Sequence, residues 1–331
     1  MNPRHLQAVF IARNREFWRD KAALAWNFAF PVLLIIGFAF GFSEDSEPYN
    51  IGVYGTPTAP LAFTDSRYIN TIDITDLEAS ILKVERHQLD LLIDFEKSRY
   101  WVNSKSERGY FLEHALANLD PDRLSRQPVS GDELRYVDWV IPGVLAMNVM
   151  FSALFGIGYV IVRYRKNGVL KRLKATPLSA LEFLLAQLAS RLWLILVVNV
   201  IIFVGCDLIV DFRMYGDYLS LLFIFLLGAI SLISMGLMVA ARTASEELAG
   251  GLLNLFSWPM MFLSGVWFSI EGLQPWVQTI AQIFPLTHMI SAARAVMIDG
   301  AGIIQVFPEI MVLCGMSCLF LLIGSYLFRW E

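Results

Sequence analysis

The residues of this chain that could do chemistry are few and widely spaced. Cys314 and Cys318 lie four residues apart, which places both thiols on one face of a helix. A redox or metal pair could use that spacing, but cysteines in apolar stretches usually behave as small hydrophobic residues. We therefore expect no metal site, and the histidines do not supply one because they are scattered along the chain, at His5, His87, His114 and His288.

The sequence also lacks the motifs of nucleotide hydrolysis and of common hydrolases. A phosphate-binding loop needs the pattern G-x-x-x-x-G-K-[ST]. Gly168 begins a basic run, but neither the second glycine nor the hydroxyl follows. H-E-x-x-H and G-x-S-x-G are absent as well. We predict that the chain is not an enzyme and binds no cofactor of its own, so that any energy input must come from a partner.

The composition indicates a membrane protein. Of the 331 residues, 56% are hydrophobic and 17% are charged, whereas soluble domains carry about 25% charged residues. A helix needs about 20 largely apolar residues to cross the hydrocarbon core. Six stretches qualify as transmembrane helices: 22–42, 137–162, 192–209 (with a start near Ser179), 218–241, 248–270 and 303–328.

The segment between the first two stretches has a different character. Residues 43–135 carry 17 acidic and 10 basic side chains. Short β-branched and aliphatic runs predict strands at 50–54, 89–95 and 100–103, and amphipathic patterns predict helices at 76–88 and 109–119. We expect residues 43–136 to form a small α/β domain, followed by the remaining helices in 137–331.

Lys and Arg set the expected orientation, because they favour the cytoplasmic side. Segment 163–174 has six basic residues and no acid, and residues 1–21 have five basic and two acidic residues. Both are expected in the cytoplasm, with both termini. The α/β domain and the acidic link 207–217 are then extracytoplasmic.

Residues 1–21 are expected to form an amphipathic helix in the cytoplasmic membrane interface rather than a disordered basic tag. Leu6, Val9, Phe10 and Phe17 fall near one helical face, a pattern typical of interfacial helices. Three arginines of this segment, Arg13, Arg15 and Arg19, are expected to lie off that face. Arg191, near the inner end of the third span, is expected to extend toward the interface.

Residues 163–180 predict a short helix, a turn and the entry to the third span. Thr176-Pro177 breaks the first helix, because proline lacks an amide donor and restricts the residue before it. Ser179 and Glu182 have the spacing of a capping box for the next helix. A short rigid helix at the membrane face suits docking of a partner, and the alternative is a basic loop that only fixes topology.

A broken segment precedes the sixth span. Between residues 257 and 300, prolines and glycines interrupt an apolar pattern, and the apolar stretch 276–284 is too short to span. Non-helical backbone at membrane depth must be covered by protein or face a cavity. We predict a re-entrant helical hairpin entering from the outer face. The alternative is an aromatic belt around an ordinary loop.

Few polar residues lie inside the expected spans, so any path between these spans is expected to be mainly apolar. Asparagines at mid-span can hydrogen-bond a neighbouring helix, and Met and Phe offer soft lining. The candidate lining residues are Asn148, Phe151, Asn199, Met235 and Asn254.

Two of these segments resemble the ABC type 2 transporter permease family. Its cytoplasmic motif R-x-x-G-x-x-x-x-L-x-x-T-P-x-S is similar to Arg165, Gly168, Leu173, Thr176, Pro177 and Ser179. Its outer signature is similar to Ser264, Gly265, Val266, Glu271, Pro275, Trp276, Pro285, Leu286, Thr287 and Arg294. Two departures are Lys171, where many members have Glu, and Ile270, where proline is common.

The resemblance implies the permease subunit of an ATP-binding cassette exporter in a bacterial inner membrane. It implies two copies of a cytoplasmic ABC ATPase, which uses ATP-Mg, and a second permease that is either identical or paralogous. The segment from Arg165 to Glu182 would couple to the ATPase, and Gly265, Glu271, Pro275, Trp276, Pro285 and Arg294 would form an outer gate. The cargo would be hydrophobic or amphipathic, membrane lipids would surround the helices, and nucleic acid would not be a partner. The alternative function is a membrane sensor or assembly scaffold that binds a ligand or partner through its outer α/β domain.

Overall fold

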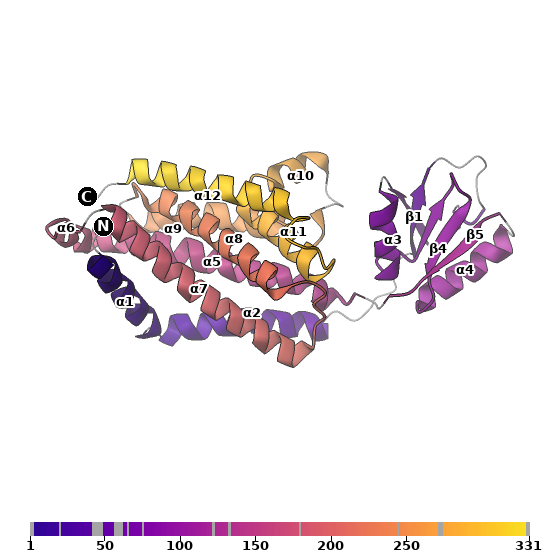
Figure 1. Cartoon of the computed structure of the whole chain (residues 1–331), viewed down its shortest axis with the longest axis horizontal. Coiled ribbons are helices and arrows are strands. Elements are labelled where there is room, and N and C mark those ends of the chain that lie inside the picture. Colours follow the sequence, from indigo (N-terminus) through magenta and orange to yellow (C-terminus); the bar gives the residue numbers. More distant parts are fainter. Residues whose placement is uncertain are drawn as a thin grey trace. The chain divides into compact units, whose positions relative to one another are not determined.

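The computed structural model shows a helical unit and a sheet-containing unit (Figure 1). The first consists of Met1–Gly41 and Val137–Glu331, and the second of Phe42–Tyr136. The structure describes residues 3–19, 21–41, 49–55, 62–64, 66–74, 76–120, 123–131, 134–178, 180–243, 245–270 and 274–328.

The helical unit begins with two consecutive helices, α1 (Pro3–Arg19) and α2 (Lys21–Gly41), and continues after the sheet-containing unit. Its other helices are α5 (Tyr136–Lys166), α6 (Val169–Lys174), α7 (Ala180–Val210), α8 (Tyr218–Ala240), α9 (Glu246–Leu263), α10 (Pro275–Ala281), α11 (Pro285–Met297) and α12 (Phe307–Leu327).

Four of the described helices are long and apolar enough to cross a membrane. They are Tyr136–Lys166, Glu182–Val210, Tyr218–Ala240 and Phe307–Leu327. The chain is therefore a helical membrane protein with an α/β region in its N-terminal half. The expected stretch 248–270 is shorter than predicted, because α9 ends at Leu263 and Gly265 then takes a φ of 77°, which no helix continues through.

Helix packing places α5 and α8 inside the helical unit. In the most apolar part of each helix, 72% of the residues are buried in α5 and 67% in α8, against 22% in α12. Helix α8 packs against α7, α11 and α12, whereas α7 also packs against α1 and α2 (Figure 1). The N-terminal helix therefore contacts the bundle directly rather than only preceding it.

The other unit is a five-stranded sheet with the order β2-β1-β3-β4-β5. Only β3 and β4 pair antiparallel, and the other neighbours are parallel. Its elements are β1 (Tyr49–Tyr54), β2 (Ile69–Ile74), α3 (Leu77–Glu85), β3 (Leu91–Asp94), β4 (Arg99–Asn103), α4 (Glu107–Leu119) and β5 (Ser125–Val129).

The two helices of this unit contribute to separate apolar clusters. Leu91 and Ile93 belong to the cluster of α4, whereas Leu92 belongs to that of α3. Successive side chains of a strand point to opposite faces of a sheet, so α3 and α4 cover opposite faces. The central strand β3 is buried throughout, which explains why its run of aliphatic residues predicts a strand so clearly.

Both edge strands were missed by the sequence patterns. Strand β2 has the sequence INTIDI and is exposed at four of its six positions, and β5 contains Pro128. Polar residues and proline are typical of edge strands, which pair on one side only. The three predicted strands are all central, and their apolar runs carry the signal that the edges lack.

A pH titration can check the packing of this unit. The Tyr100 hydroxyl donates to Glu113 Oε1 at 2.9 Å. Burial and this hydrogen bond raise the pKa of Tyr100 from 10.0 to about 12. The resulting stabilisation is complete below pH 10 and is lost as the pH rises toward 12. The absorbance titration of the native chain minus that of Tyr100→Phe should show a midpoint near 12, and a midpoint near 10 would contradict the packing.

Candidate functional site

The segment expected to dock a partner forms a short exposed helix after α5. Gly168 has a φ of 67°, a conformation that favours glycine, and it reverses the chain into α6. Leu170 is fully buried and anchors α6 to the helical unit. Lys171 and Arg172 are exposed, so α6 presents positive charge outward.

The residues after α6 form the turn that leads into α7. The Thr176 hydroxyl donates to the Leu173 carbonyl oxygen at 2.6 Å, and Thr176 and Pro177 are both exposed. Ser179 lies outside the described residues, so the capping box expected with Glu182 is untested. Glu182 itself is buried in the first turn of α7.

Arg165 occupies a different environment from its neighbours in the motif. Its side chain is buried and donates to carbonyl oxygens at the end of α8: Nη1 to Ala240 at 2.9 Å, Nη2 to Ala241 at 3.0 Å and Nη1 to Thr243. The last carbonyls of a helix lack backbone donors and carry partial negative charge. Arg165 therefore caps α8 and joins it to the end of α5.

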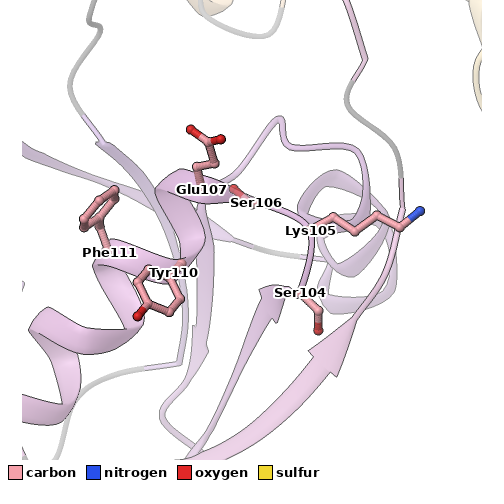
Figure 2. Close-up of a pocket in the computed structure, with 6 residues that line it drawn as sticks. All are labelled: Ser104, Lys105, Ser106, Glu107, Tyr110 and Phe111. Carbon is pink, nitrogen blue, oxygen red and sulfur yellow. The ribbon is translucent and has the colours of Figure 1, made fainter.

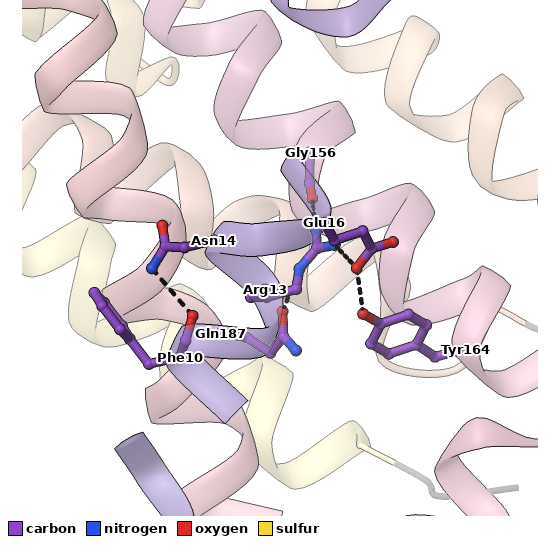
Figure 3. Close-up of polar contacts among 7 residues, drawn as sticks. All are labelled: Phe10, Arg13, Asn14, Glu16, Gly156, Tyr164 and Gln187. Carbon is purple, nitrogen blue, oxygen red and sulfur yellow. Dashed lines mark hydrogen bonds and ion pairs between the residues drawn. The ribbon is translucent and has the colours of Figure 1, made fainter. Parts of the chain in front are cut away.

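Arg13 of α1 points into the helical unit instead of lying off the apolar face as expected. Its Nε donates to Gln187 Oε1 of α7 at 3.0 Å, and its Nη2 donates to the Gly156 carbonyl oxygen of α5 at 3.1 Å (Figure 3). The interfacial prediction missed this side chain because its partners lie more than 140 residues away in the sequence.

Arg191 is buried rather than extended toward the interface. Its Nε donates to the Ser152 carbonyl oxygen of α5 at 2.7 Å, and its Nη2 binds the same oxygen. Its guanidinium lies 5.6 Å from the Phe17 ring centroid. Gly156 provides the space, because a Cβ there would lie 2.0 Å from Arg191 Cζ.

Arg294 of α11 connects the turn after α9, which is part of the predicted outer gate, to the start of α5. Its Nη2 donates to the Gly265 carbonyl oxygen at 2.6 Å, its Nε donates to the Trp139 carbonyl oxygen at 3.2 Å, and its guanidinium lies 3.5 Å from the Trp139 ring centroid. The structure thus brings Gly265 and Arg294 together and adds Trp139, at the start of α5, which the sequence patterns did not identify.

The other gate residues have separate environments. Pro275 and Pro285 lie in the first turns of α10 and α11, where proline needs no amide donor. Trp276 is exposed, and its indole Nε1 donates to Gln274. Glu271 lies outside the described residues. The buried Thr287 hydroxyl donates to the Ala281 carbonyl oxygen at 2.6 Å and accepts from Ser264 Oγ at 2.9 Å, which links α11 to the end of α9.

The candidate lining residues differ in burial. Asn148, Asn199 and Met235 are buried, Phe151 is partly buried and Asn254 is exposed. The Asn199 Oδ1 atom is buried without a hydrogen-bond partner among the described residues. Their role in a pathway stays a prediction.

Two surface features carried no clear sequence signal. An open depression on the α/β unit is lined by residues around the start of α4, where Tyr110 and Phe111 are exposed (Figure 2). It is completed by Ser104, Lys105, Ser106 and Glu107. An apolar groove lies between α7, α8 and α12, with leucines as its main lining. Neither the depression nor the groove includes a predicted site residue.

The described residues contain no group of three His, Cys, Asp or Glu side chains arranged to hold a metal ion. Cys206, Cys314 and Cys318 are free thiols.

Comparison with known proteins gives a consistent family assignment. A family profile described as ABC-2 type transporter matches residues 87–298. The probable multidrug ABC transporter permease YbhS of Escherichia coli (strain K12) is 20% identical over 364 residues, covering 98% of this chain and 94% of YbhS. The inner membrane transport permease YhhJ of the same organism is 29% identical over 198 residues, covering 56% of this chain and 51% of YhhJ. YbhR, a second probable multidrug ABC transporter permease of that organism, is 20% identical over 226 residues, covering 65% of this chain and 60% of YbhR.

Proposed function

Since this chain belongs to the ABC-2 type transporter family, as the permease subunit of an ABC exporter powered by a separate ATPase, we propose a docking site for that ATPase. The site consists of α6 and the turn that follows it. The observation that carries this proposal is the geometry of α6. A fully buried leucine fixes the helix to the permease while its basic side chains face outward.

The charge of α6 specifies the partner surface. Lys171, Arg172 and Lys174 are exposed, and no acidic residue lies between residues 163 and 174. Complementary charges steer association and fix register. The matching cleft on the ATPase is therefore acidic, which accommodates Lys171 where many family members have Glu.

We propose a layout of six spans in a bacterial inner membrane, with both termini in the cytoplasm. Helices α2 and α9 add to the four long apolar helices, and α10 and α11 form the re-entrant hairpin. The basic residues around α6 support this orientation, and the α/β unit is then extracytoplasmic. Arg294 holds the hairpin against the start of α5.

The cargo we propose is hydrophobic or amphipathic. The buried residues of the long helices are mainly apolar, and YbhS, which matches 98% of the chain, and YbhR, which matches 65% of it, are both named as probable multidrug permeases. A working transporter would contain a second permease and two ATPase copies. The relatives YbhS and YbhR occur in one organism, which supports a paralogous partner as well as an identical one.

Charge reversal on α6 tests the docking site. Lys171→Glu combined with Arg172→Glu should weaken binding of the ATPase at least about tenfold, because two favourable charge pairs become repulsive. Binding can be measured with the purified ATPase and the permease in lipid nanodiscs. Lys97→Glu, which reverses an exposed charge on the α/β unit, is the matched control and should leave binding unchanged.

Equal binding by the α6 variant and the control would refute docking at α6. Transport into inverted vesicles then tests the function itself. ATP hydrolysis by an intact complex without movement of any hydrophobic or amphipathic probe would instead favour a sensor or scaffold.

A further inference from the structure

The last turn of α5 contacts three other elements through three consecutive side chains. Tyr164 binds α1, Arg165 binds the end of α8, and Lys166 approaches the start of α9. This turn ends two residues before Gly168, the residue that precedes α6. The chain therefore connects α6 to α5 directly through this turn.

The contact with α1 is made through a carboxylate. The Tyr164 hydroxyl donates to Glu16 Oε2 at 2.7 Å, and Arg13 Nη1 donates to the same oxygen at 2.7 Å (Figure 3). Burial alone would raise the pKa of Glu16, but the Tyr164 hydrogen bond and the Arg13 guanidinium lower it overall. Glu16 is thus a carboxylate at neutral pH, and both hydrogen bonds to it are charge-assisted.

The α1 contact continues to α7. Arg13 also donates to Gln187 of α7 and to the Gly156 carbonyl oxygen of α5. Gln187 is almost fully buried, so this link lies within the packed unit rather than at its surface. Tyr164, Glu16, Arg13 and Gln187 form a continuous chain of hydrogen bonds from α5 through α1 to α7.

The contact with α8 follows a separate route. Arg165 binds three carbonyl oxygens at and beyond the end of α8. Lys166 Nζ lies 4.0 Å from Glu246 Oε1 at the start of α9, a partly exposed pair that contributes little. The two hydrogen-bonded contacts of the turn therefore diverge, one toward α1 and α7 and the other toward α8.

We propose that Tyr164 and Arg165 are positioning residues that distribute movement of α6 during ATP-driven transport, Tyr164 to α1 and α7 and Arg165 to α8. This inference rests on the proposed docking of the ATPase at α6. The physical reason is that packed helices move as rigid elements, so the helix to which a displaced turn is hydrogen-bonded determines which elements follow. A membrane-interface helix such as α1 becomes a moving part of the transporter rather than a passive anchor.

Tyr164→Phe in the full permease, assembled with its ATPase in proteoliposomes, separates this role from docking. It removes one hydroxyl and keeps the ring. The amount of probe transported per ATP hydrolysed should fall about threefold to tenfold, while the affinity for the ATPase and the KM for ATP stay unchanged. Glu16→Ala, which removes the acceptor, should produce the same fall, and the double variant should be no worse than either single variant.

The control is Tyr159→Phe, on the same helix, whose hydroxyl makes no hydrogen bond within the described part of the chain. It should transport as the native protein does. Unchanged transport per ATP in Tyr164→Phe would overturn the inference, and so would a fall in ATPase affinity, because Tyr164 would then belong to the docking surface. The docking proposal is judged separately by the α6 charge reversal, which changes ATPase affinity.

A distance measurement supplies an activity-independent readout. Spin labels can be attached at Arg15→Cys on α1 and Arg242→Cys after α8, both exposed positions, in protein whose native cysteines are replaced. They report the distance between α1 and the end of α8. Trapping the ATPase with ATP and vanadate should change this distance in the native background and change it less in Tyr164→Phe. An equal change in both would also overturn the inference.

Discussion

Replacing Gly156 with alanine should destabilise the helical unit by about 3–5 kcal/mol, the cost of removing the partner of a buried charge. The added Cβ would lie 2.0 Å from Arg191 Cζ, so the guanidinium would have to withdraw. Arg191 would then lose both hydrogen bonds to the Ser152 carbonyl oxygen and its position near the Phe17 ring. No acidic side chain among the described residues contacts Arg191, so no second partner is available.

Gly251→Ala provides a control with the opposite sign. Gly251 also lies within a helix, but no described atom lies within 4 Å of a Cβ built there. Alanine in an open helical position should stabilise by up to about 1 kcal/mol. Thermal unfolding in detergent measures both variants, with transport as a second readout.

A second substitution identifies the cause. Adding Arg191→Met to Gly156→Ala removes the guanidinium that the new methyl group would meet. The double variant should recover part of the lost stability, because it leaves no buried charge without a partner. The explanation would be wrong if Gly156→Ala melted like Gly251→Ala, or if the second substitution only added to the loss.

Removing the guanidinium of Arg294 should have the next largest effect. Arg294→Met loses hydrogen bonds to the carbonyl oxygens of Gly265 and Trp139 and the contact with the Trp139 ring. Hydrogen bonds from charged groups contribute about 1.5–3 kcal/mol each. We expect transport to fall at least about tenfold and hydrogen exchange in residues 264–270 to accelerate. Lysine should not restore function, because a single ammonium group lacks the planar fork that reaches two carbonyls and stacks on a ring.

The matched control for this variant is Arg242→Met. Arg242 is an exposed arginine between α8 and α9, and its loss should leave both transport and exchange in residues 264–270 unchanged. If residues 264–270 exchanged hydrogen in Arg294→Met at the same rate as in the native protein, Arg294 would not be what fixes the hairpin.

The sequence predicts most helices because their apolar character is local. Helix α8 coincides with the expected stretch 218–241 to within a residue, and α7 begins next to Ser179, where an early start was expected, and ends beside residue 209. Helix α9 was expected to continue to residue 270, since its apolar composition extends past Gly265 and composition does not report the positive φ of that glycine. Strands β2 and β5 were missed because an edge strand has no buried run to reveal it.

The polar contacts of the candidate site could not be predicted in the same way. Arg13 was expected to lie off the apolar face of an interfacial helix, and Arg191 was expected to extend toward the interface from the inner end of the third span, yet both bind oxygens inside the unit. Their partners on α5 are main-chain atoms, which no residue pattern distinguishes. One available signal was Gly156 at mid-helix, because a glycine inside a helix often has a packing reason.

Four arginines that join the helices of this permease all donate to main-chain oxygens. Arg13 and Arg191 bind α5, Arg165 binds the end of α8, and Arg294 binds the first turn of α5 and the turn after α9. Every residue type offers the same carbonyl group, so the acceptor positions can change identity without losing the bond, provided that their side chains leave room. Distant relatives can thus diverge at these acceptors while the helices keep their arrangement, and analyses of correlated substitution would not detect the pairs.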